Sequence, residues 1–401
     1  MRLPALKMLD QLDVKNKNVF LRLDLNVPLQ GTNILDLTRL ETCLPTLEFL
    51  ISGQARVVIA SHLGRPQGQV NSDFSLEPVG NALTHMIKKE VYFFSEHQRM
   101  PATDLFDQNS SAQLVLLENL RFHPEETSSA PVPAFCQQLG RGIDYYVFDA
   151  FGVSHRKHAS VYGLPQWLGY DKCYAGYQVN REYQTLTSLF RSPPSPLFIV
   201  MGGSKIAGKL DALLSLLPHA HHAIIGGAMA IPFLKTLGYS TGAHHFSNKE
   251  CELARMILRN SADYPVKIHL PLDHMLAESC DEQANTSESE SQNIPPDMWA
   301  LDIGPKTREY FTNVLAEKAT ILWNGPVGVY EWPNCGLGSK TIAEAIASNP
   351  GTSIVGGGDS LALISRYGLR KSMTHLSTGG GAMLDFLGQK KLPGLLALTT
   401  H

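Results

Sequence analysis

The sequence predicts an α/β protein built from two doubly wound parallel-sheet (Rossmann-like) domains joined by a helix. Three observations support this fold class. The chain has 401 residues, more than the usual size of one domain. Short apolar runs alternate with amphipathic segments of helix length, the order that forms right-handed βαβ units and parallel sheets. Runs such as FIVM at 198–201 are apolar without alternation, which is typical of strands covered on both faces.

The expected strands form two series, one in each half of the chain. The first is 19–23, 56–60, 91–94, 114–117 and 145–148, and the second is 197–201, 223–225, 266–270, 320–323, 353–355 and 375–376. Between them, residues 178–190 are expected to form a helix, which the prolines of the RSPPSP segment must end. We therefore expect an N-terminal domain over 1–173, an interdomain helix and hinge over 174–192, and a C-terminal domain over 193–385.

Composition and charge limit the kinds of partner and the cellular location that we expect for the protein. Lys and Arg number 34 and Asp and Glu number 37, a net charge of −3, which argues against a nucleic-acid partner or a polybasic membrane anchor. The N-terminal segment lacks the apolar core of a secretory signal, and no run approaches the length of a transmembrane helix. The six cysteines are scattered without a CxxC pair, which favours reduced thiols in a cytoplasmic protein.

Polar residues follow the strands of the first series. Ligands of open α/β sheets bind beyond the carboxyl ends of the strands, so these residues are expected to meet at one sheet edge. Arginine suits bidentate recognition of phosphate and carboxylate, and four strand ends delivering similar chemistry predict a polyanion site. The candidate residues are Asp24, Asn26, Arg39, His62, Leu63, Gly64, Arg65, Arg121 and Arg156.

Glycine clusters follow the strands of the second series, at 202–203, 226–227, 325–328, 356–358 and 379–381. Glycine lets backbone N–H groups approach phosphate, and the helix that follows each turn favours negative charge. These turns predict a nucleotide cradle, with Lys205 and Lys209 as cationic groups and Asp359 as a Mg²⁺ ligand. The segment from Gly203 to Lys209 fits most of a Walker A motif, but Leu210 stands where the metal-binding Ser or Thr is required.

Several segments then carry a resemblance to a known family. In chain order they are LRLDLNVPL, SHLGRP, LLENLRF, DAFGVSHRKHAS, GGSKIAGK, DIGPKT, LWNGPVGVYE, GGGDS and STGGGA-to-LPG. They resemble phosphoglycerate kinase, in the family's order, from about Met8 to Leu398. The resemblance implies the phosphoglycerate kinase fold, with a C-terminal tail over 386–401 that packs on the N-terminal domain. It also implies reversible phosphoryl transfer from 1,3-bisphosphoglycerate to ADP, giving 3-phosphoglycerate and ATP.

The resemblance assigns roles residue by residue. The nine candidate residues of the first half would bind the glycerate ligand. The nucleotide would be bound by Gly203, Lys209, Gly227, Asn324, Glu331, Gly357, Gly358, Asp359 and Ser360, with Asp359 holding Mg²⁺. The reaction itself would depend on Arg39, Lys205, Lys209 and Gly380. A monomer that closes about its hinge is implied as well. No general base is needed, because the acceptor carboxylate is ionised at pH 7.

The sequence departs from the family pattern at several positions. Ala228 stands where the family commonly has glycine, and Ile231-Pro232 stands where it commonly has Asn-Thr. Threonine is common at the positions of Ser339 and Ser360. Cys335 replaces a common phenylalanine, and Phe148 replaces a common asparagine. They concern the adenosine side more than the reacting centre.

Two other classes of protein are alternatives to this interpretation. A nicotinamide-dependent oxidoreductase needs G-x-G-x-x-G after its first strand, but the first strand here ends in DLN. A two-domain ligand-binding protein without catalysis would usually be exported, and it would not need two lysines and a metal carboxylate at its ligand. The sequence alone leaves open the possibility that the chain is a non-catalytic member of the family.

Overall fold

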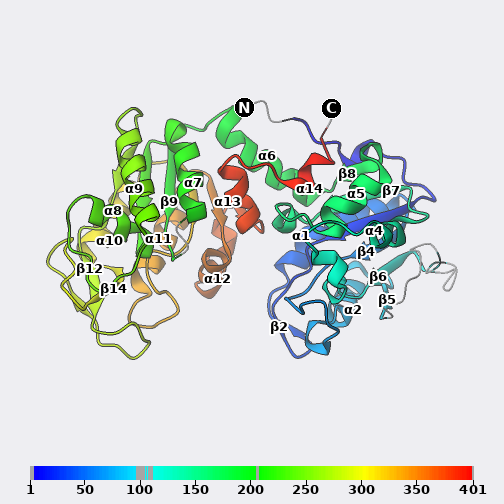
Figure 1. Cartoon of the computed structure of the whole chain (residues 1–401), viewed down its shortest axis with the longest axis horizontal. Coiled ribbons are helices and arrows are strands. Elements are labelled where there is room, and N and C mark those ends of the chain that lie inside the picture. The colour runs from blue at the N-terminus through cyan, green and yellow to red at the C-terminus, as the bar shows by residue number, and fades with distance from the viewer. Residues whose placement is uncertain (1–3, 96–103, 105, 107–111, 205–206, 400–401) are drawn as a thin grey trace. The chain divides into compact units, whose positions relative to one another are not determined.

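The computed structural model describes residues 4–95, 104, 106, 112–204 and 207–399. The chain divides into two compact units (Figure 1). Unit 1 is Met1–Thr185 with Lys391–His401, and unit 2 is Leu186–Lys390. Helix α6 (Tyr177–Arg191) runs from the first unit into the second, where the sequence predicts a helix over 178–190. Within the described residues, none of the helices is both long and apolar enough to span a membrane.

Unit 1 is built on a six-stranded, fully parallel sheet in the order β5-β6-β4-β1-β7-β8. The strands are β1 (Asn18–Leu23), β4 (Arg56–Ala60), β5 (Tyr92–Phe94), β6 (Leu114–Leu117), β7 (Tyr145–Asp149) and β8 (Cys173–Ala175), and a small hairpin pairs β2 (Leu29–Gln30) with β3 (Asn33–Ile34). The sequence predicts five of the six sheet strands to within a residue or two. It missed β8, a short edge strand.

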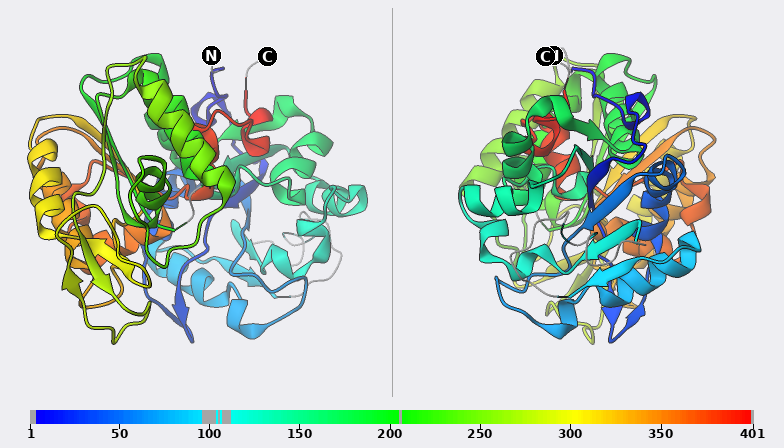
Figure 2. Two further views of the ribbon diagram at one scale, coloured as in Figure 1. Left: turned by 60° about the vertical axis from the view of Figure 1, so that its left-hand side comes forward. Right: turned by 90° about the vertical axis from the view of Figure 1, so that its right-hand side faces the viewer.

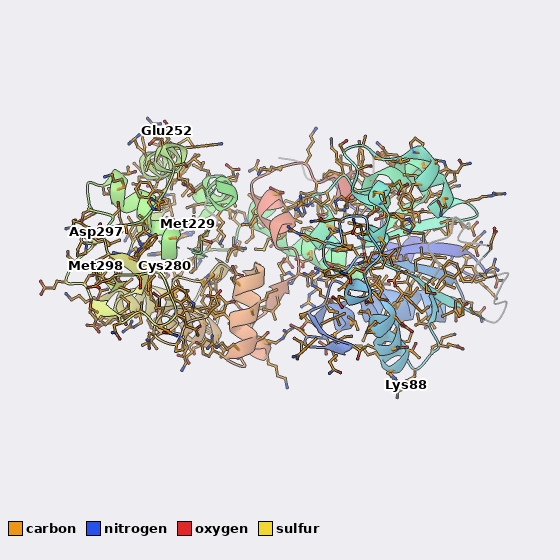
Figure 3. The ribbon with its side chains drawn as sticks, turned by 60° about the horizontal axis from the view of Figure 1, so that its bottom comes forward. Lys88, Met229, Glu252, Cys280, Asp297 and Met298 are labelled. Carbon is orange, nitrogen blue, oxygen red and sulfur yellow. The ribbon has the colours of Figure 1, made fainter. Side chains whose placement is uncertain are left out.

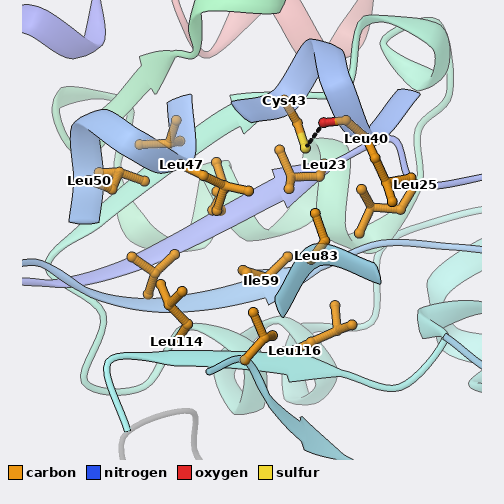
Figure 4. Packing of buried hydrophobic residues seen from close by; sticks show 14 of the residues in the cluster. Leu23, Leu25, Leu40, Cys43, Leu47, Leu50, Ile59, Leu83, Leu114 and Leu116 are labelled. Atoms are coloured by element: carbon orange, nitrogen blue, oxygen red, sulfur yellow. Dashed lines mark hydrogen bonds between the residues drawn. The ribbon is translucent and has the colours of Figure 1, made fainter. Parts of the chain in front are cut away.

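Helices cover both faces of this sheet. Successive residues of a strand point to opposite faces, so each strand contributes side chains to the packing on both sides. Leu21 and Leu23 of β1 belong to one apolar cluster with Leu47 of α1. Figure 4 shows Leu23 and Leu47 within this cluster. Phe20 and Arg22 point to the other face, where Phe20 stacks on Tyr146. The helices of this unit are α1 (Thr38–Ser52), α2 (Glu77–Ile87), α4 (Pro133–Gly140), α5 (Leu164–Leu168) and α14 (Pro393–Leu396), with short turns η1 (Leu9–Gln11), η2 (Ser72–Phe74), η3 (Leu120–Phe122), η4 (Pro124–Thr127), η5 (Phe151–Val153), η6 (Ala159–Gly163) and η7 (Tyr170–Lys172).

The end of α2 illustrates how local backbone chemistry stops a helix. Lys88 follows the helix in the left-handed region, with φ of 53°. A residue in this conformation turns the chain away from the helix axis. Its side chain is exposed and lies at the end of the helix, as Figure 3 shows.

The C-terminal segment belongs to unit 1 from Lys391 onward. Leu6 pairs with Thr399 in an antiparallel bridge, and the amide of Lys7 donates to the carbonyl of Leu398 at 2.7 Å. Both views of Figure 2 show this red segment beside the dark-blue start of the chain. Residues 386–390, which the sequence analysis groups with the tail, lie in unit 2, where 386–387 end helix α13.

Unit 2 also has a six-stranded parallel sheet, in the order β11-β10-β9-β15-β16-β17. The strands are β9 (Leu197–Met201), β10 (His222–Ile225), β11 (Lys267–His269), β15 (Thr320–Asn324), β16 (Ser353–Gly356) and β17 (His375–Ser377). Numbered along the chain, this order is the 3-2-1-4-5-6 arrangement of dinucleotide-binding folds. The direction of winding therefore reverses between β9 and β15, and the sequence predicts every strand of this sheet.

Helices surround this second sheet, and a smaller sheet adjoins it. The helices are α7 (Ala207–Leu216), α8 (Ile231–Thr236), α9 (Asn248–Ser261), α10 (Pro305–Leu315), α11 (Leu337–Ser348), α12 (Gly358–Arg366) and α13 (Gly381–Leu387), with turns η8 (Leu217–His219), η9 (Gly227–Ala230) and η10 (Arg370–Ser372). The antiparallel sheet joins β12 (His274–Ala277), β13 (Ser287–Glu288) and β14 (Trp299–Ile303), and the sequence analysis missed it. The two doubly wound parallel-sheet units confirm the predicted fold class.

Candidate active site

In unit 1, the loop after β1 is held by its own polar side chains. Asp24 follows the strand directly, is 9% exposed, and forms an ion pair with Arg39 of α1. The side-chain oxygen of Asn26 accepts the amide N–H of Gly64 at 2.8 Å, which ties this loop to the turn after β4. The two strands are neighbours in the sheet. The predicted residues Asp24, Asn26, Arg39 and Gly64 therefore do meet at one sheet edge.

The turn after β4 places His62, Leu63, Gly64 and Arg65. Gly64 has φ of +60°, and a Cβ built on it would lie 2.3 Å from the ring of Phe74, so only glycine fits. The side chain of Leu63 is buried, and its carbonyl accepts the side-chain amide of Asn119 at 2.7 Å. His62 is buried and Arg65 is exposed. This single turn thus places the buried imidazole of His62 and the exposed guanidinium of Arg65 three residues apart.

Arg121, in the turn η3 that follows β6, completes this edge. Its Nη1 donates to the carbonyl of Gly64 at 2.7 Å, while its buried Nε has no hydrogen-bond partner among the described residues. Burial, followed by repulsion from Arg22, lowers the pKa of Arg121 to about 10. Arg156, after β7, is exposed, and neither it nor Arg65 forms an ion pair within the described part of the chain. Exposed cations without an ion-pair partner among the described residues, such as Arg65 and Arg156, suit an anionic ligand.

Sequence reasoning missed the buried part of this cluster. Arg22 is fully buried within β1, next to His62, and Glu126 of η4 is fully buried as well. Burial and the charge of Arg22 lower the pKa of His62 well below its usual range. A signal was available: arginine inside the apolar run VFLRL must be paired once the strand is covered on both faces.

In unit 2, the turns after β9 and β15 touch each other at the point where the winding reverses. A Cβ built on Gly202 would lie 2.1 Å from the carbonyl oxygen of Pro326. A Cβ on Gly325 would lie 2.3 Å from both the carbonyl oxygen of Gly202 and Nζ of Lys209. Glycine is therefore required for the two backbones to approach so closely.

Lys209 lies among these turns. Its side chain is 7% exposed, and its ammonium donates to the carbonyl of Gly202. Gly203 and Gly227 are close by: a Cβ on Gly203 would come within 3.0 Å of the ammonium, and one on Gly227 within 3.1 Å of the Gly203 nitrogen. The structure thus brings three predicted residues together around one buried cation. Lys205, the second predicted lysine, lies outside the described residues.

The turn after β16 contacts the end of β15. A Cβ on Gly357 would lie 3.2 Å from the side-chain amide nitrogen of Asn324, a buried group without a hydrogen-bond partner among the described residues. Ser360 is fully buried, and its hydroxyl accepts the amide N–H of Gly325 at 2.7 Å. Ser360 therefore supports the glycine turn, while the side-chain nitrogen of Asn324 has no acceptor among the described residues.

Gly358 and Asp359 start α12 and are exposed, as is Glu331 after β15. Arg366, at the end of the same helix, donates through Nη1 to the carbonyls of Tyr330 at 2.9 Å and Glu331 at 3.4 Å. One helix thus presents Asp359 at its start and holds the Glu331 segment at its end. Gly380 precedes α13, and a Cβ built on it would meet nothing within 4 Å.

The acidic residues of unit 2 bear on metal binding. No group of three or more His, Cys, Asp or Glu residues that could hold a metal ion occurs among the described residues. Asp359 is instead a single exposed carboxylate beside glycine turns. This donor set fits Mg²⁺, which is commonly held by one or two carboxylates and completed by substrate phosphates.

The departures from the family pattern are accommodated by packing. Ile231 and Pro232 are buried at the start of α8, and Cys335 is buried with Leu301. The hydroxyl of Ser339 accepts the amides of Val327 and Gly328, at 3.0 and 3.2 Å. A serine hydroxyl is sufficient for these bonds.

The fold and the chemistry of its strand ends are those of an α/β phosphotransferase. One unit gathers arginines at its sheet edge, and the other gathers glycine turns around a buried lysine.

Comparisons with known proteins identify the family. The family model described as phosphoglycerate kinase matches residues 9–390. Phosphoglycerate kinase of Borrelia duttonii is 38% identical over 394 residues, covering 98% of this chain and 99% of that protein. The protein of the same name from Koribacter versatilis is 41% identical over 397 residues, covering 97% and 98%. The structure of phosphoglycerate kinase from Coxiella burnetii has a TM-score of 0.84 at 33% identity, covering 98% of this chain and 99% of that one.

The chain therefore belongs to the phosphoglycerate kinase family. This membership confirms the resemblance predicted from the ordered motifs. The protein is a glycolytic kinase, a transferase with a carboxyl group as acceptor. The oxidoreductase alternative is excluded.

Proposed function

We propose that the chain transfers a phosphoryl group directly between 1,3-bisphosphoglycerate and ADP, giving 3-phosphoglycerate and ATP, with Mg²⁺ bound to the nucleotide. The observation that carries the proposal is the buried ammonium of Lys209 at the glycine turns after β9 and β15. A buried cation among backbone donors suits the phosphates of a nucleotide.

The N-terminal domain, residues 1–173, would bind the glycerate ligand. Its cations at the sheet edge supply charge for a phosphate and a carboxylate, and arginine meets both groups with paired donors. Arg65 and Arg156 are exposed for this contact, and the Arg121 Nε has an unused N–H among the described residues. The remaining contacts would come from Asp24, Asn26, Arg39, His62, Leu63 and Gly64.

The C-terminal domain, residues 193–385, would bind the nucleotide. Lys209 and the turns at Gly203, Gly227 and Gly357–Ser360 would hold its phosphates, and Asn324 and Glu331 would contact its remainder. Asp359 would hold Mg²⁺, which when bound neutralises phosphate charge. None of the residues that depart from the family pattern carries a charged side chain.

The transfer itself would need positioning and charge stabilisation, with no covalent enzyme intermediate. The acceptor carboxylate is ionised at pH 7, so no general base has to remove a proton. Arg39, Lys205 and Lys209 would stabilise charge on the transferring group, and the amides at Gly380 would add donors. Accordingly, the proposal assigns no proton-transfer role to His62.

The two proposed ligand sets lie on different units, so we propose that closure about a hinge brings the two ligands in line for transfer. Residues 174–192 would act as the hinge, with the C-terminal tail anchored on unit 1. Closure would also exclude water from the reactive phosphate. Small-angle scattering should show compaction when both ligands are bound, and unchanged dimensions would count against closure.

A coupled assay tests the activity. With 3-phosphoglycerate and Mg-ATP supplied, 1,3-bisphosphoglycerate is removed by reduction, and NADH oxidation reports the rate. We expect oxidation to require both substrates and Mg²⁺. A chain that binds both ligands without turnover would instead be a non-catalytic member of the family.

We propose that the enzyme acts as a cytoplasmic monomer without nucleic-acid or membrane partners, in keeping with its free cysteines and near-neutral charge.

A further inference from the structure

A continuous line of buried polar groups connects Glu126 to His62 in unit 1. The two carboxylate oxygens of Glu126 accept hydrogen bonds from Ser160, from its backbone N–H at 2.8 Å and from its hydroxyl at 2.7 Å. The Ser160 hydroxyl oxygen accepts Nε–H of Arg22 at 2.9 Å. Nη2 of Arg22 lies 3.3 Å from Nδ1 of His62. None of the four side chains is more than 3% exposed.

The fold fixes each member of this line. Arg22 alternates with Leu21 and Leu23 on β1, so it points away from the apolar cluster that contains them. Ser160 lies in η6, a π-helical turn, and its carbonyl accepts the hydroxyl of Tyr146 at 2.8 Å. Because all four residues are buried, the line is part of the packed interior of unit 1.

The charges in this region explain why a buried carboxylate is needed. Arg22, Arg39 and Arg121 act together on His62, and His158 faces the same group. Burial raises the pKa of Glu126, while Arg22 and the two bonds from Ser160 oppose that rise. An arginine buried without a counter-charge would be strongly unfavourable, so Glu126 stabilises the position of Arg22.

The contact with Arg22 also determines where the proton of His62 lies. Arginine has only donors, so Nδ1 of His62 must accept, and a neutral ring then carries its proton on Nε2. Burial, Arg22 and Arg121 all lower the pKa of His62 well below its usual range. At neutral pH the ring is therefore an uncharged donor.

We propose that Glu126 is a positioning residue that acts through Ser160 and Arg22 to hold His62 as the neutral Nε2–H tautomer, which donates to an anionic oxygen of the glycerate ligand. The assignment of that ligand rests on the function proposed above. Glu126 itself touches no ligand in this scheme. Its effect is to fix which ring nitrogen of His62 offers a donor.

Long-range ¹H–¹⁵N correlation spectra of the full chain, recorded without ligand, test the tautomer. The wild type should show the Nε2–H pattern for His62, assigned by its absence in H62Q. Glu126→Gln should shift the ring toward a mixture of tautomers, because the amide cannot accept both bonds from Ser160. Glu125→Gln is the matched control: Glu125 is the neighbouring, half-buried acid of η4 and should leave the pattern unchanged.

Kinetics supply a second readout. Glu126→Gln should raise the KM for 3-phosphoglycerate about tenfold, the scale of one lost hydrogen bond to a charged group, and leave the KM for ATP unchanged. Glu126→Asp should partly restore both the tautomer and the KM. Because Glu126 is buried, Ser160→Ala provides a second variant, which removes the hydroxyl between Glu126 and Arg22 and should act in the same direction.

An Nδ1–H pattern for His62 in the wild type overturns the proposal. The proposal is also overturned if Glu126→Gln and Ser160→Ala both keep the wild-type His62 pattern and the wild-type KM for 3-phosphoglycerate. The spectra do not depend on turnover. A wild-type chain with the Nε2–H tautomer but no activity would therefore refute the proposed function and leave the tautomer assignment of His62 standing.

Discussion

The guanidinium of Arg39 forms an ion pair with the carboxylate of Asp24. Asp24 directly follows β1, and Arg39 lies in the first turn of α1, so the pair fixes a helix start against a strand end. Asp24 is 9% exposed and Arg39 is 31% exposed. The more accessible partner is thus the cation, which is held in place before any ligand binds.

Replacing Arg39 tests this preorganisation. We expect Arg39→Ala to lower kcat by roughly 10²–10³, the scale for losing one preorganised donor to a developing charge. Steady-state kinetics with both substrates saturating measure the effect. Arg141→Ala, which removes an exposed arginine after α4, is the matched control and should keep wild-type kinetics. Equal kcat values for the two variants would remove Arg39 from the reacting centre.

Lys209 supplies the corresponding test in unit 2. Lys209→Ala should lower kcat by roughly 10²–10³ or more, because a buried ammonium at the phosphates acts in a low-dielectric environment. Lys249→Ala removes an exposed lysine of α9 and serves as the control. Near-normal turnover by Lys209→Ala would contradict the assigned role, whatever its effect on KM.

The sequence predicts the parallel strands well because their apolar runs reflect burial on both faces. It predicts the strand-end residues because the carboxyl ends of parallel strands meet at one edge. It did not predict Arg22, whose partners Ser160 and Glu126 are distant in the chain and meet only in the folded unit. Nor could it show that the Ser360 hydroxyl supports Gly325, since a hydroxyl's direction depends on its tertiary neighbours.

The smaller sheet of unit 2 was missed for a related reason. Its strands β12, β13 and β14 are short, and β13 is exposed, so no apolar period marks it. Antiparallel pairing between β12 and β14 becomes evident only when the chain between them folds back. The local sequence pattern therefore predicts the two main sheets, whereas the pairing of short strands depends on tertiary contacts.

Asp359 is the residue expected to hold Mg²⁺. Asp359→Asn should shift the Mg²⁺ titration of activity to higher concentration, because an uncharged amide is a poorer ligand for a hard cation than a carboxylate. The rate is measured against free Mg²⁺ at fixed nucleotide. Asp263→Asn changes an exposed acid after α9 and should leave the titration in place. An identical titration for both variants would refute the assignment.

The contact between Gly202 and Pro326 predicts a strong steric effect. Gly202→Ala places a Cβ 2.1 Å from a backbone carbonyl oxygen, and neither backbone can yield cheaply. We expect the free energy of unfolding to fall by about 1–3 kcal/mol or more, measured by urea denaturation. Gly208→Ala is the matched control, since its Cβ meets nothing within 4 Å. A stability loss shared equally by both variants would show that the contact is not the cause.

Asp302 predicts a dependence of stability on pH. It lies in β14 and accepts the amides of Gly338 at 2.7 Å and Ile303 at 2.9 Å, and burial raises its pKa to about 7. Because the folded pKa exceeds the unfolded value, the folded state binds more protons between about pH 4 and pH 7. The contribution of Asp302 to the free energy of unfolding is therefore fully present below about pH 4 and is lost as the pH rises toward 7.

Asp302→Asn removes this titration. The free energy of unfolding of the wild type, relative to the variant, should fall as the pH rises from 4.5 to 7, by at most about 1.4 kcal/mol per pH unit. Urea denaturation at each pH measures the difference. Asp297→Asn changes an exposed acid of the same unit, labelled in Figure 3, and is the matched control. A relative stability of Asp302→Asn that stays constant with pH would mean that Asp302 is ionised throughout this range, stabilised by its two amide donors more than burial opposes it.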